Sequence, residues 1–321
     1  MSATITVIIP CYNAEKYIER CLIALDKQTF KDFSVIFVDD CSQDDTVNIL
    51  ENYKMKAQYD VTVLKNDVNQ GPGASRNKAI AFANSKYLAF CDSDDWYDDD
   101  YLELLFQSIK ENESDVAFCG YKVISETGKI VYRYLDSSDK KVNKIEALKY
   151  DCDSLCMMIA SASIFDRVQL PNLRNGEDMA VIPLIMVNSN NCSILAKCPY
   201  NYYRRKASSS EKRNIDVVNS LLKSFEYLTE HFPSDRYLEL EFIGIKNVVY
   251  ACLITLFSFS FDKKKAKSII TNFDLQFNGW ANNPLIKTLP FYKRCFISLA
   301  KKRFFIGMRF VAIFRKILVR K

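Results

Sequence analysis

Tyr87-Leu88-Ala89-Phe90-Cys91-Asp92-Ser93-Asp94-Asp95-Trp96 decides the fold, because an apolar run passes directly into a cluster of carboxylates. A short apolar run bounded by polar residues is typical of a buried strand. In open α/β sheets, ligands bind at the carboxyl ends of the strands, where these carboxylates would lie. Hard cations such as Mg²⁺ prefer carboxylate oxygen and share their sites with substrate phosphates. The stretch therefore predicts a metal–diphosphate site; the simpler alternative is a solvated acidic turn before a helix that begins near Asp98.

The composition is that of a globular protein with room for one large domain and an appendage. The chain has 321 residues, of which 49% are hydrophobic and 26% charged. Its 11 Cys and single His form no ligand set for a structural zinc site. The odd number of Cys and the absence of a secretory signal predict a reducing, cytoplasmic location. The net charge of +5 is modest, so its location matters more than its size. The clustered basic residues lie in the C-terminal tail, and we therefore expect no nucleic acid partner.

The first hundred residues alternate between apolar strands and amphipathic helices. The strands are continuously apolar, which is typical of buried parallel strands in an α/β protein. We therefore expect a doubly wound, mostly parallel sheet flanked by helices, with a helical C-terminal appendage. The expected strands are Thr4–Ile9, ended by Pro10, and Phe33–Val38, Val61–Leu64 and Tyr87–Phe90; the expected helices are Ala14–Lys27, Thr46–Tyr53 and Lys78–Ala83.

Polar loops follow all four expected strands, so they would converge at one edge of the sheet. Tyr12 can stack on a base, Asp40 can accept a base N–H, Arg76 can meet a phosphate or base, and Asp94 can hold a metal. Each residue alone has a simpler explanation: a surface aromatic, a helix cap or turn residue, or a surface charge. The glycine loop at 71–73 matches neither the dinucleotide fingerprint nor the P-loop. Their ordered occurrence nevertheless predicts a nucleoside diphosphate site.

The same residues resemble family 2 glycosyltransferases with the GT-A fold. The resemblance covers about the first hundred residues and implies an inverting transferase that uses a nucleotide-diphospho-sugar, most often a UDP-sugar, with Mn²⁺ or Mg²⁺. The matching stretches are Val7–Asn13, Gln28–Phe30, Val38–Thr46, Asn69–Asn77 and Asp92–Asp95.

The resemblance also implies a role for each polar residue at this edge. Tyr12 would stack near the uracil, Asp40 would bind its polar edge, and Arg76 would lie on the nucleotide side. Asp92 would face the ribose, and Asp94 would be the metal ligand. Three residues of the same loops complete the expected nucleotide-sugar site: Pro10, Asn13 and Ser93.

A catalytic base is expected in the second half of the chain. The candidate is Gly176-Glu177-Asp178, in which the resemblance implies Asp178 as the base and Glu177 as its acidic neighbour. Transfer to a hydroxyl requires such a group, since the proton must be accepted as the new bond forms. The alternative is two acids in the first turn of a helix, where the helix dipole favours them. Pro183 predicts that this helix starts late or kinks.

The stretch Tyr200–Ser208 resembles the end of the family's catalytic domain, where a basic residue reaches the pyrophosphate. Arg204 is the candidate, and a solvated basic loop is the alternative. One departure concerns the acceptor side: relatives often carry a Trp or a Lys between Asp151 and Phe165, whereas Ser154–Ser161 is small and apolar here. The acceptor therefore stays open.

The C-terminal region differs in composition from the rest. We expect a transferase domain over 1–207, with a nucleotide-sugar half (1–100) and an acceptor half (101–207), a hinge near 208–214, and a helical region over 208–321. Val248–Phe261 is apolar but short, so it predicts a buried helix. In the tail, 299–321, basic residues at positions 302, 309, 316 and 320 would share one face of an amphipathic helix. Each would contribute about 1 kcal/mol at an anionic leaflet; the alternative is a helix docked on the catalytic domain.

The leading hypothesis is a transferase that moves a sugar from a UDP-sugar to a hydroxyl of a glycan. The basic tail and the resemblance together imply that this glycan is lipid-linked. The transferase would act in surface polysaccharide biosynthesis, at the inner face of the cell membrane as a peripheral protein. Two alternatives stay open: a sugar-nucleotide pyrophosphorylase, and a non-catalytic nucleotide-sugar binder or membrane-docked assembly protein.

Overall fold

The computed structural model describes residues 2–173, 176–205 and 214–319. The chain divides into two compact units, residues 1–206 and 207–321. Of the expected hinge at 208–214, residues 208–213 lie outside the described residues, as do the side chains after Arg315.

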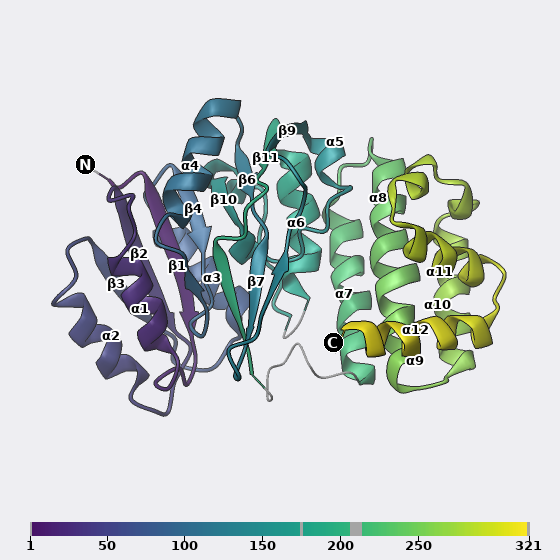
Figure 1. Cartoon of the computed structure of the whole chain (residues 1–321), viewed down its shortest axis with the longest axis horizontal. Coiled ribbons are helices and arrows are strands. Elements are labelled where there is room, and N and C mark those ends of the chain that lie inside the picture. Colours follow the sequence, from purple (N-terminus) through teal and green to yellow (C-terminus); the bar gives the residue numbers. More distant parts are fainter. Residues whose placement is uncertain (1, 174–175, 206–213, 320–321) are drawn as a thin grey trace. The chain divides into compact units, whose positions relative to one another are not determined.

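The first unit is built on an eight-stranded sheet in the order β3-β2-β1-β4-β10-β6-β11-β9 (Figure 1). Its first four strands are parallel, and β10 runs antiparallel to both of its neighbours. All seven residues of β1 are buried, which explains its continuous apolar sequence. The strands are β1 (Ile5–Cys11), β2 (Phe33–Asp39), β3 (Val61–Lys65), β4 (Tyr87–Phe90), β6 (Val116–Phe118), β9 (Lys140–Asn143), β10 (Met158–Ser161) and β11 (Asn191–Ile194).

Helices cover both faces of this sheet, with α1 in front and α3 behind in the view of Figure 1. The expected doubly wound, mostly parallel α/β fold is thus confirmed. The helices of this unit are α1 (Ile18–Asp26), α2 (Thr46–Lys54), α3 (Pro72–Phe82), α4 (Tyr101–Asn112), α5 (Lys144–Ala147) and α6 (Glu177–Asn188).

A second sheet of four strands was not expected from the sequence. Its order is β5-β12-β7-β8, with β5 (Trp96–Tyr97), β12 (Tyr200–Arg204), β7 (Tyr121–Ser125) and β8 (Ile130–Arg133). Strand β5 follows the acidic cluster directly and pairs antiparallel with β12. This pairing brings residues 200–205 beside Asp92–Asp95, although a hundred residues separate them in the chain.

We expected Pro10 to end the first strand. It lies instead inside β1, opposite Val38 of β2. The carbonyl oxygen of Ile8 accepts a hydrogen bond from the N–H of Cys91, on the side of β1 that faces β4. In a parallel strand the backbone groups of every second residue face the same side, so the nitrogen of Pro10 also faces β4. Pairing with β4 ends at Ile8. The missing N–H therefore costs no ladder hydrogen bond, which is where a strand tolerates proline.

Three helix starts also differ from expectation. Helix α3 begins at Pro72 rather than Lys78, because proline suits the first helical position and Gly71, at φ +88°, makes the turn before it. Helix α1 begins at Ile18, after a turn. Helix α6 begins at Glu177 and continues through Pro183, so the proline does not delay it.

The second unit is helical, and its longest helical run is mostly buried. The run Tyr237–Phe259 is long and apolar enough to cross a membrane by length and composition, but 78% of its most apolar window is buried inside the structure. This agrees with the expected buried helix over Val248–Phe261. The helices are α7 (Ile215–His231), α8 (Tyr237–Gly244), a π-helical segment (Ile245–Cys252), α9 (Leu253–Phe259), α10 (Lys263–Gln276), α11 (Phe291–Lys301) and α12 (Phe305–Val319).

The basic face expected in the C-terminal tail is wrong in two respects. Helix α11 ends before Lys302 and α12 begins at Phe305, with Arg303 at φ +52° between them, so Lys302 shares no helix with Arg309. Arg309 also points inward, where its Nη1 donates to the carbonyl oxygens of Phe257 and Ser260. Apolar side chains occupy exposed positions of α12 instead: Ile306, Phe310, Ile313 and Phe314.

Candidate active site

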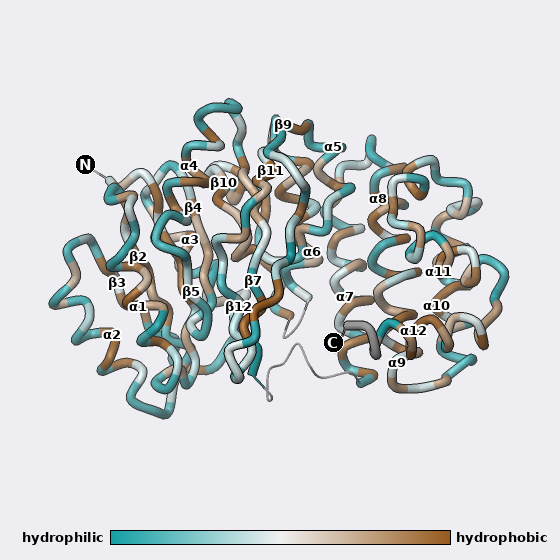
Figure 2. Tube along the Cα trace, in the orientation of Figure 1, coloured by the Kyte–Doolittle hydropathy of each residue, from teal (hydrophilic) through white to brown (hydrophobic). Residues whose placement is uncertain are grey.

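The polar loops that follow β1, β2 and β4 gather at one edge of the large sheet, as expected. These strands are parallel neighbours, so their carboxyl ends point the same way. In Figure 2 the strands are mainly hydrophobic, and the loops at their carboxyl ends, in the lower part of the view, are mainly hydrophilic. The N-terminus of α6 supplies the acid pair predicted in the second half of the chain.

Arg76 connects the two acidic groups of this edge. It lies on α3 and is only 3% exposed. Its Nη2 donates to Oδ1 of Asp92 at 2.6 Å, and its Nη1 donates to Oε1 of Glu177 at 3.1 Å. Burial alone would lower the pKa of Arg76, but the charges of Asp92 and Asp178 outweigh it and raise the pKa. The guanidinium therefore stays charged and holds the acidic cluster after β4 against the first turn of α6.

Asp178 carries an unusually basic carboxylate. Burial, followed by the negative charge of Glu177, raises the pKa of Asp178 to about 8, and Arg76 only partly opposes this. Its Oδ1 atom is buried and has no hydrogen-bond partner within the described part of the chain. A titratable group perturbed in this way, with an unused acceptor atom, is a candidate for proton transfer.

Asp94, the expected metal ligand, forms an ion pair with Arg205. The guanidinium of Arg205 also lies 4.4 Å from the ring centroid of Tyr17, at the start of α1. Burial, and then the charge of Asp92, raise the pKa of Asp94, whereas Arg205 opposes the shift. The protein therefore already supplies a cationic partner, the Arg205 guanidinium, for the carboxylate of Asp94.

Arg205 is thus a basic residue that meets the acidic cluster, and the sequence had named its neighbour Arg204 for the diphosphate. Contact between Arg204 and a diphosphate stays a prediction. Successive residues of a strand point to opposite faces, and β12 follows this rule. Tyr203 and Arg205 both approach Tyr17, with 6.5 Å between the two tyrosine ring centroids, whereas Arg204 is exposed. The strand alternation was the signal that could have separated the two arginines, had the strand been recognised.

Asp95 is a structural residue of the cluster. Its Oδ2 accepts from the hydroxyl of Tyr200 at 2.6 Å, and its Oδ1 accepts from the backbone N–H of Tyr203 at 2.7 Å. The carboxylate is buried. These bonds fix β12 beside the acidic cluster, an arrangement that the sequence analysis did not predict.

Asp40 lies at the end of β2, where it was expected, but its carboxylate faces the protein. Oδ1 accepts from the side chain of Asn66 at 2.8 Å and from the N–H of Gln70 at 2.9 Å, and Oδ2 accepts from the N–H of Gly71 at 2.7 Å. The residue thus anchors the loop that leads into α3. Contact between Asp40 and a base stays a prediction.

The other predicted residues of the nucleotide-sugar site lie at the same edge. Tyr12 is 51% exposed and available for stacking. Asn13, at φ +49°, joins the loops after β1 and β2: its N–H donates to Ser42 Oγ at 3.0 Å, and its Oδ1 accepts from the N–H of Gln43 at 2.8 Å. Pro10 is buried in β1, and Ser93 is half-buried between the two carboxylates that flank it.

The donor atoms present fit a hard divalent cation, although the protein does not surround one. No group of three or more His, Cys, Asp or Glu side chains that could hold a metal occurs among residues 2–173, 176–205 and 214–319. The site offers instead the carboxylate of Asp94, which already pairs with a cation. One or two carboxylates completed by substrate phosphates are typical of Mg²⁺.

Comparison with known proteins decides the family. The sequence profile described as glycosyl transferase family 2 matches residues 6–170. The chain belongs to this family. It is 33% identical over 182 residues to a Bacillus subtilis protein named as the teichuronic acid biosynthesis glycosyltransferase TuaG. The alignment covers 55% of this chain and 69% of TuaG. The protein described here is accordingly a glycosyltransferase, as the resemblance implied.

One further relative and two solved structures extend the comparison. Poly(ribitol-phosphate) β-N-acetylglucosaminyltransferase TarS from Staphylococcus aureus is 29% identical over 204 residues, which is 63% of this chain but only 35% of TarS. The crystal structure of S. aureus TarS 1–349 in complex with UDP-GlcNAc has a TM-score of 0.65 at 24% identity, covering 96% of this chain and 90% of that one. Mannosyltransferase PcManGT from Pyrobaculum calidifontis, in complex with GDP-Man and Mn²⁺, has a TM-score of 0.57 at 13% identity, covering 100% and 89%. These two structures confirm the fold.

Proposed function

We propose that this glycosyltransferase moves a sugar from a UDP-sugar to a hydroxyl of a glycan acceptor, with inversion at the anomeric carbon. The observation that carries the proposal is the bridge that the buried Arg76 makes between Asp92 and Glu177, next to the basic carboxylate of Asp178. This bridge supports a nucleotide-sugar site at Asp92 with a proton acceptor, Asp178, beside it. The UDP and UDP-GlcNAc complexes of TarS support a UDP-sugar donor.

In the proposed reaction, Asp178 accepts the proton of the attacking hydroxyl. Its raised pKa makes the deprotonated carboxylate a stronger base than an ordinary Asp. The new bond joins the acceptor oxygen to the anomeric carbon, while the bond from that carbon to the diphosphate breaks and UDP leaves. Glu177 holds Arg76 in place, and the positive charge of Arg76 balances the acids as Asp178 changes its protonation state.

We propose Asp94 as the protein ligand of Mn²⁺ or Mg²⁺, with the donor diphosphate supplying further oxygens. A bound divalent cation neutralises charge on the departing diphosphate. Arg205, which pairs with Asp94 in this structure, is positioned to contact the diphosphate once that carboxylate has another cationic partner. The Mn²⁺ complex of PcManGT supports a metal in this fold.

The acceptor is proposed from the names of the relatives. TuaG is named for teichuronic acid biosynthesis and TarS for transfer to poly(ribitol-phosphate). We therefore propose a role in cell-surface polysaccharide biosynthesis with a glycan or lipid-linked acceptor, at the inner face of the cell membrane.

We further propose that α12 attaches the second unit to an anionic membrane as a peripheral protein. Ile306, Phe310, Ile313 and Phe314 follow the spacing of one helix face and are all exposed, with Phe310 at 72%. Residues 301–303, at the end of α11 and in the turn that leads to α12, are two lysines and an arginine, all exposed. An exposed apolar face next to basic residues is typical of a helix that lies in a membrane interface.

The experiment that tests the transfer function is a panel of nucleotide-sugars incubated with Mn²⁺ and assayed for slow hydrolysis to free nucleotide. Release of UDP from one donor, lost on chelation, would identify the sugar and support the metal–diphosphate site. Binding of UDP without hydrolysis or transfer, with every acceptor offered, would favour a non-catalytic binder. Formation of UDP-sugar from UTP and a sugar phosphate would favour a pyrophosphorylase.

A further inference from the structure

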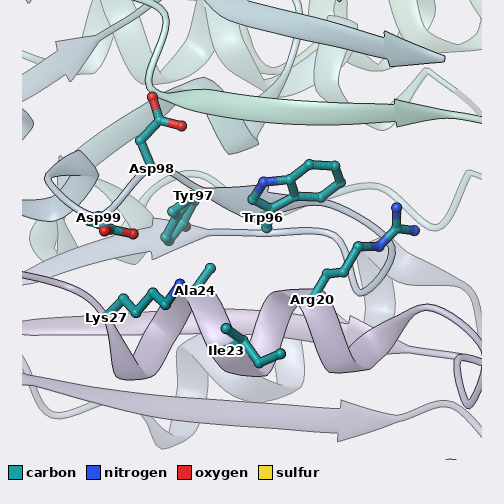
Figure 3. Close-up of a pocket in the computed structure, with 8 residues that line it drawn as sticks. All are labelled: Arg20, Ile23, Ala24, Lys27, Trp96, Tyr97, Asp98 and Asp99. Atoms are coloured by element: carbon teal, nitrogen blue, oxygen red, sulfur yellow. The ribbon is translucent and has the colours of Figure 1, made fainter. Parts of the chain in front are cut away.

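A separate pocket lies between α1 and the segment that follows the acidic cluster. Its volume is about 590 Å³, within the range of small-molecule sites. Figure 3 shows the side chains of α1 along one side and those of residues 96–99 along the other. The lining residues are Arg20, Ile23, Ala24, Lys27, Trp96, Tyr97, Asp98 and Asp99.

The lining combines apolar surface with charged groups of both signs. Trp96 and Ile23 supply an aromatic and an aliphatic surface, and Ile23 is 47% exposed. The side chains of Lys27 and Asp99 make no hydrogen bond or ion pair within the described part of the chain, and Arg20 makes only ring contacts there. Its guanidinium lies 3.8 Å from the Tyr203 ring centroid and 4.9 Å from that of Trp96.

Asp98 is the exception, because the protein already satisfies its carboxylate. It accepts from Lys122 Nζ at 2.7 Å and from Asn201 Nδ2 at 2.8 Å. Asp98 thus fixes the wall of the pocket, and the groups left to a ligand are two cations, Arg20 and Lys27, and one carboxylate, Asp99.

This set of groups selects a ligand class. Ionised Lys and Arg only donate hydrogen bonds, and an ionised Asp only accepts them. A phosphate would be repelled by Asp99, and an ammonium ligand would be repelled by Arg20 and Lys27. A sugar hydroxyl both donates and accepts, and the C–H face of a pyranose ring can pack on an indole. A neutral sugar ring can bond to the two cations and the carboxylate through its hydroxyls and pack its C–H face on the aromatic wall, and it is the ligand class that we test.

We propose that this pocket is a saccharide-binding subsite that holds a sugar residue of the acceptor chain away from the reacting one. The assignment to the acceptor rests on the proposed function, whereas the binding of a sugar does not. Trp96 directly follows the acidic cluster, and its ring centroid lies 6.2 Å from that of Tyr203. Tyr203 in turn approaches Tyr17, over which Arg205 lies. A glycan in the pocket would thus be separated from Asp94 by one row of side chains in contact, Trp96, Tyr203, Tyr17 and Arg205.

The test uses the two tryptophans of the chain as reporters. Trp96 lines the pocket, and Trp280 is buried in the other unit. In ¹H–¹⁵N spectra of the full chain, Trp280→Phe assigns the two indole signals. Methyl β-D-glucopyranoside and methyl N-acetyl-β-D-glucosaminide are then added to about 100 mM, since one sugar ring binds in roughly the millimolar range. We expect the Trp96 signal to shift in a saturable way with at least one glycoside, and the Trp280 signal to stay in place.

Variants then locate the binding. Ile23→Glu and Lys27→Glu should each weaken the sugar affinity at least about fivefold, the effect of one lost hydrogen bond or apolar contact. Lys31→Glu is the matched control, an exposed lysine outside the pocket, and should leave the affinity unchanged. Equal weakening by all three substitutions would refute the assignment.

Other outcomes separate this proposal from the proposed function. If neither glycoside moves the Trp96 signal while UDP still binds with Mn²⁺, the subsite is refuted and the transfer function stands. If glycerol 3-phosphate moves it at lower concentration than the glycosides, the ligand class is wrong. If UDP displaces the glycoside, the pocket belongs to the donor site and the proposal fails. Sugar binding without hydrolysis of any donor would support the subsite and count against the transfer function.

Discussion

Arg76 and Glu177 are 101 residues apart in the chain and form a buried ion pair, with 3.1 Å between Nη1 and Oε1. The same guanidinium bonds to Asp92, so one buried cation joins the polar end of β4 to the start of α6. The two halves of the site are thus positioned by one charge, and the geometry of the proposed base depends on it.

Arg76→Ala should destabilise the first unit by about 3–5 kcal/mol, because it leaves buried carboxylates without their counter-charge. The measurement is urea unfolding followed by circular dichroism. Glu51→Gln is the control: Glu51 pairs with Lys65 at 3.2 Å on the surface, where an ion pair contributes less than about 1 kcal/mol. If Arg76→Ala lowers the free energy of unfolding no more than Glu51→Gln does, the ion pairs of Arg76 with Asp92 and Glu177 do not stabilise the fold.

The strands of the first hundred residues could be predicted from sequence because each is a short apolar run that ends in polar residues. β4 was predicted at its observed bounds, and β2 and β3 each extend one residue further than predicted. The proline in β1 was misread, because its tolerance depends on where pairing with β4 ends. That depends on a neighbouring strand, and no local pattern contains it.

The sequence predicted which residues form the site but not which of them contact one another. Asp94 and Asp178 follow from their motifs, but Arg205 meets Asp94 only because β12 pairs with β5. Such a pairing joins distant parts of the chain. The prediction for the tail failed because a local spacing does not show where a helix ends. The seven residues from Lys302 to Arg309 place two side chains on one helix face only if the helix is continuous, and here it is interrupted at Arg303.

Asp178→Asn should abolish sugar transfer and leave UDP binding within about twofold, because it removes the proposed base without adding or removing volume. The measurements are transfer or donor-hydrolysis rate and UDP affinity with Mn²⁺. In the wild-type protein, kcat/KM should rise with pH through about 8, since the carboxylate must lose its proton to act as base and its pKa is about 8. A profile already flat above about pH 5 would exclude Asp178 as the titrating base.

The same substitution should stabilise the protein at alkaline pH. The pKa of Asp178 is raised from an ordinary 3.8 to about 8, so the folded protein binds more protons than the unfolded chain between these values. Its contribution to the free energy of unfolding is therefore full below about pH 4 and is lost as the pH rises through 8. Asp178→Asn should be more stable than wild type near pH 8.5, and this advantage should shrink towards pH 4. Lower stability of the variant at both pH values would contradict the shift.

Arg205→Ala should strengthen the binding of Mn²⁺ to the nucleotide-free protein, because Arg205 and the metal compete for the carboxylate of Asp94. Asp94→Asn should weaken that binding and should abolish metal-dependent binding of UDP. The matched control is Arg204→Ala, which removes an equal charge from the neighbouring exposed residue. Mn²⁺ affinity is measured by titration with electron paramagnetic resonance. If Arg204→Ala and Arg205→Ala raise it equally, the effect is one of net charge and the competition is disproved.

Membrane attachment through α12 should depend on its exposed apolar face. Phe310→Glu should reduce binding to vesicles of phosphatidylglycerol and phosphatidylcholine at least about tenfold, because it puts a charge on a face that would enter the interface and repels the anionic lipid. Leu275→Glu is the control: Leu275 is 81% exposed on α10, so the same change is made in the same unit away from α12. Co-sedimentation with vesicles gives the affinity. Equal losses in both variants, or binding by neither variant nor wild type, would show that α12 is not a membrane-binding helix.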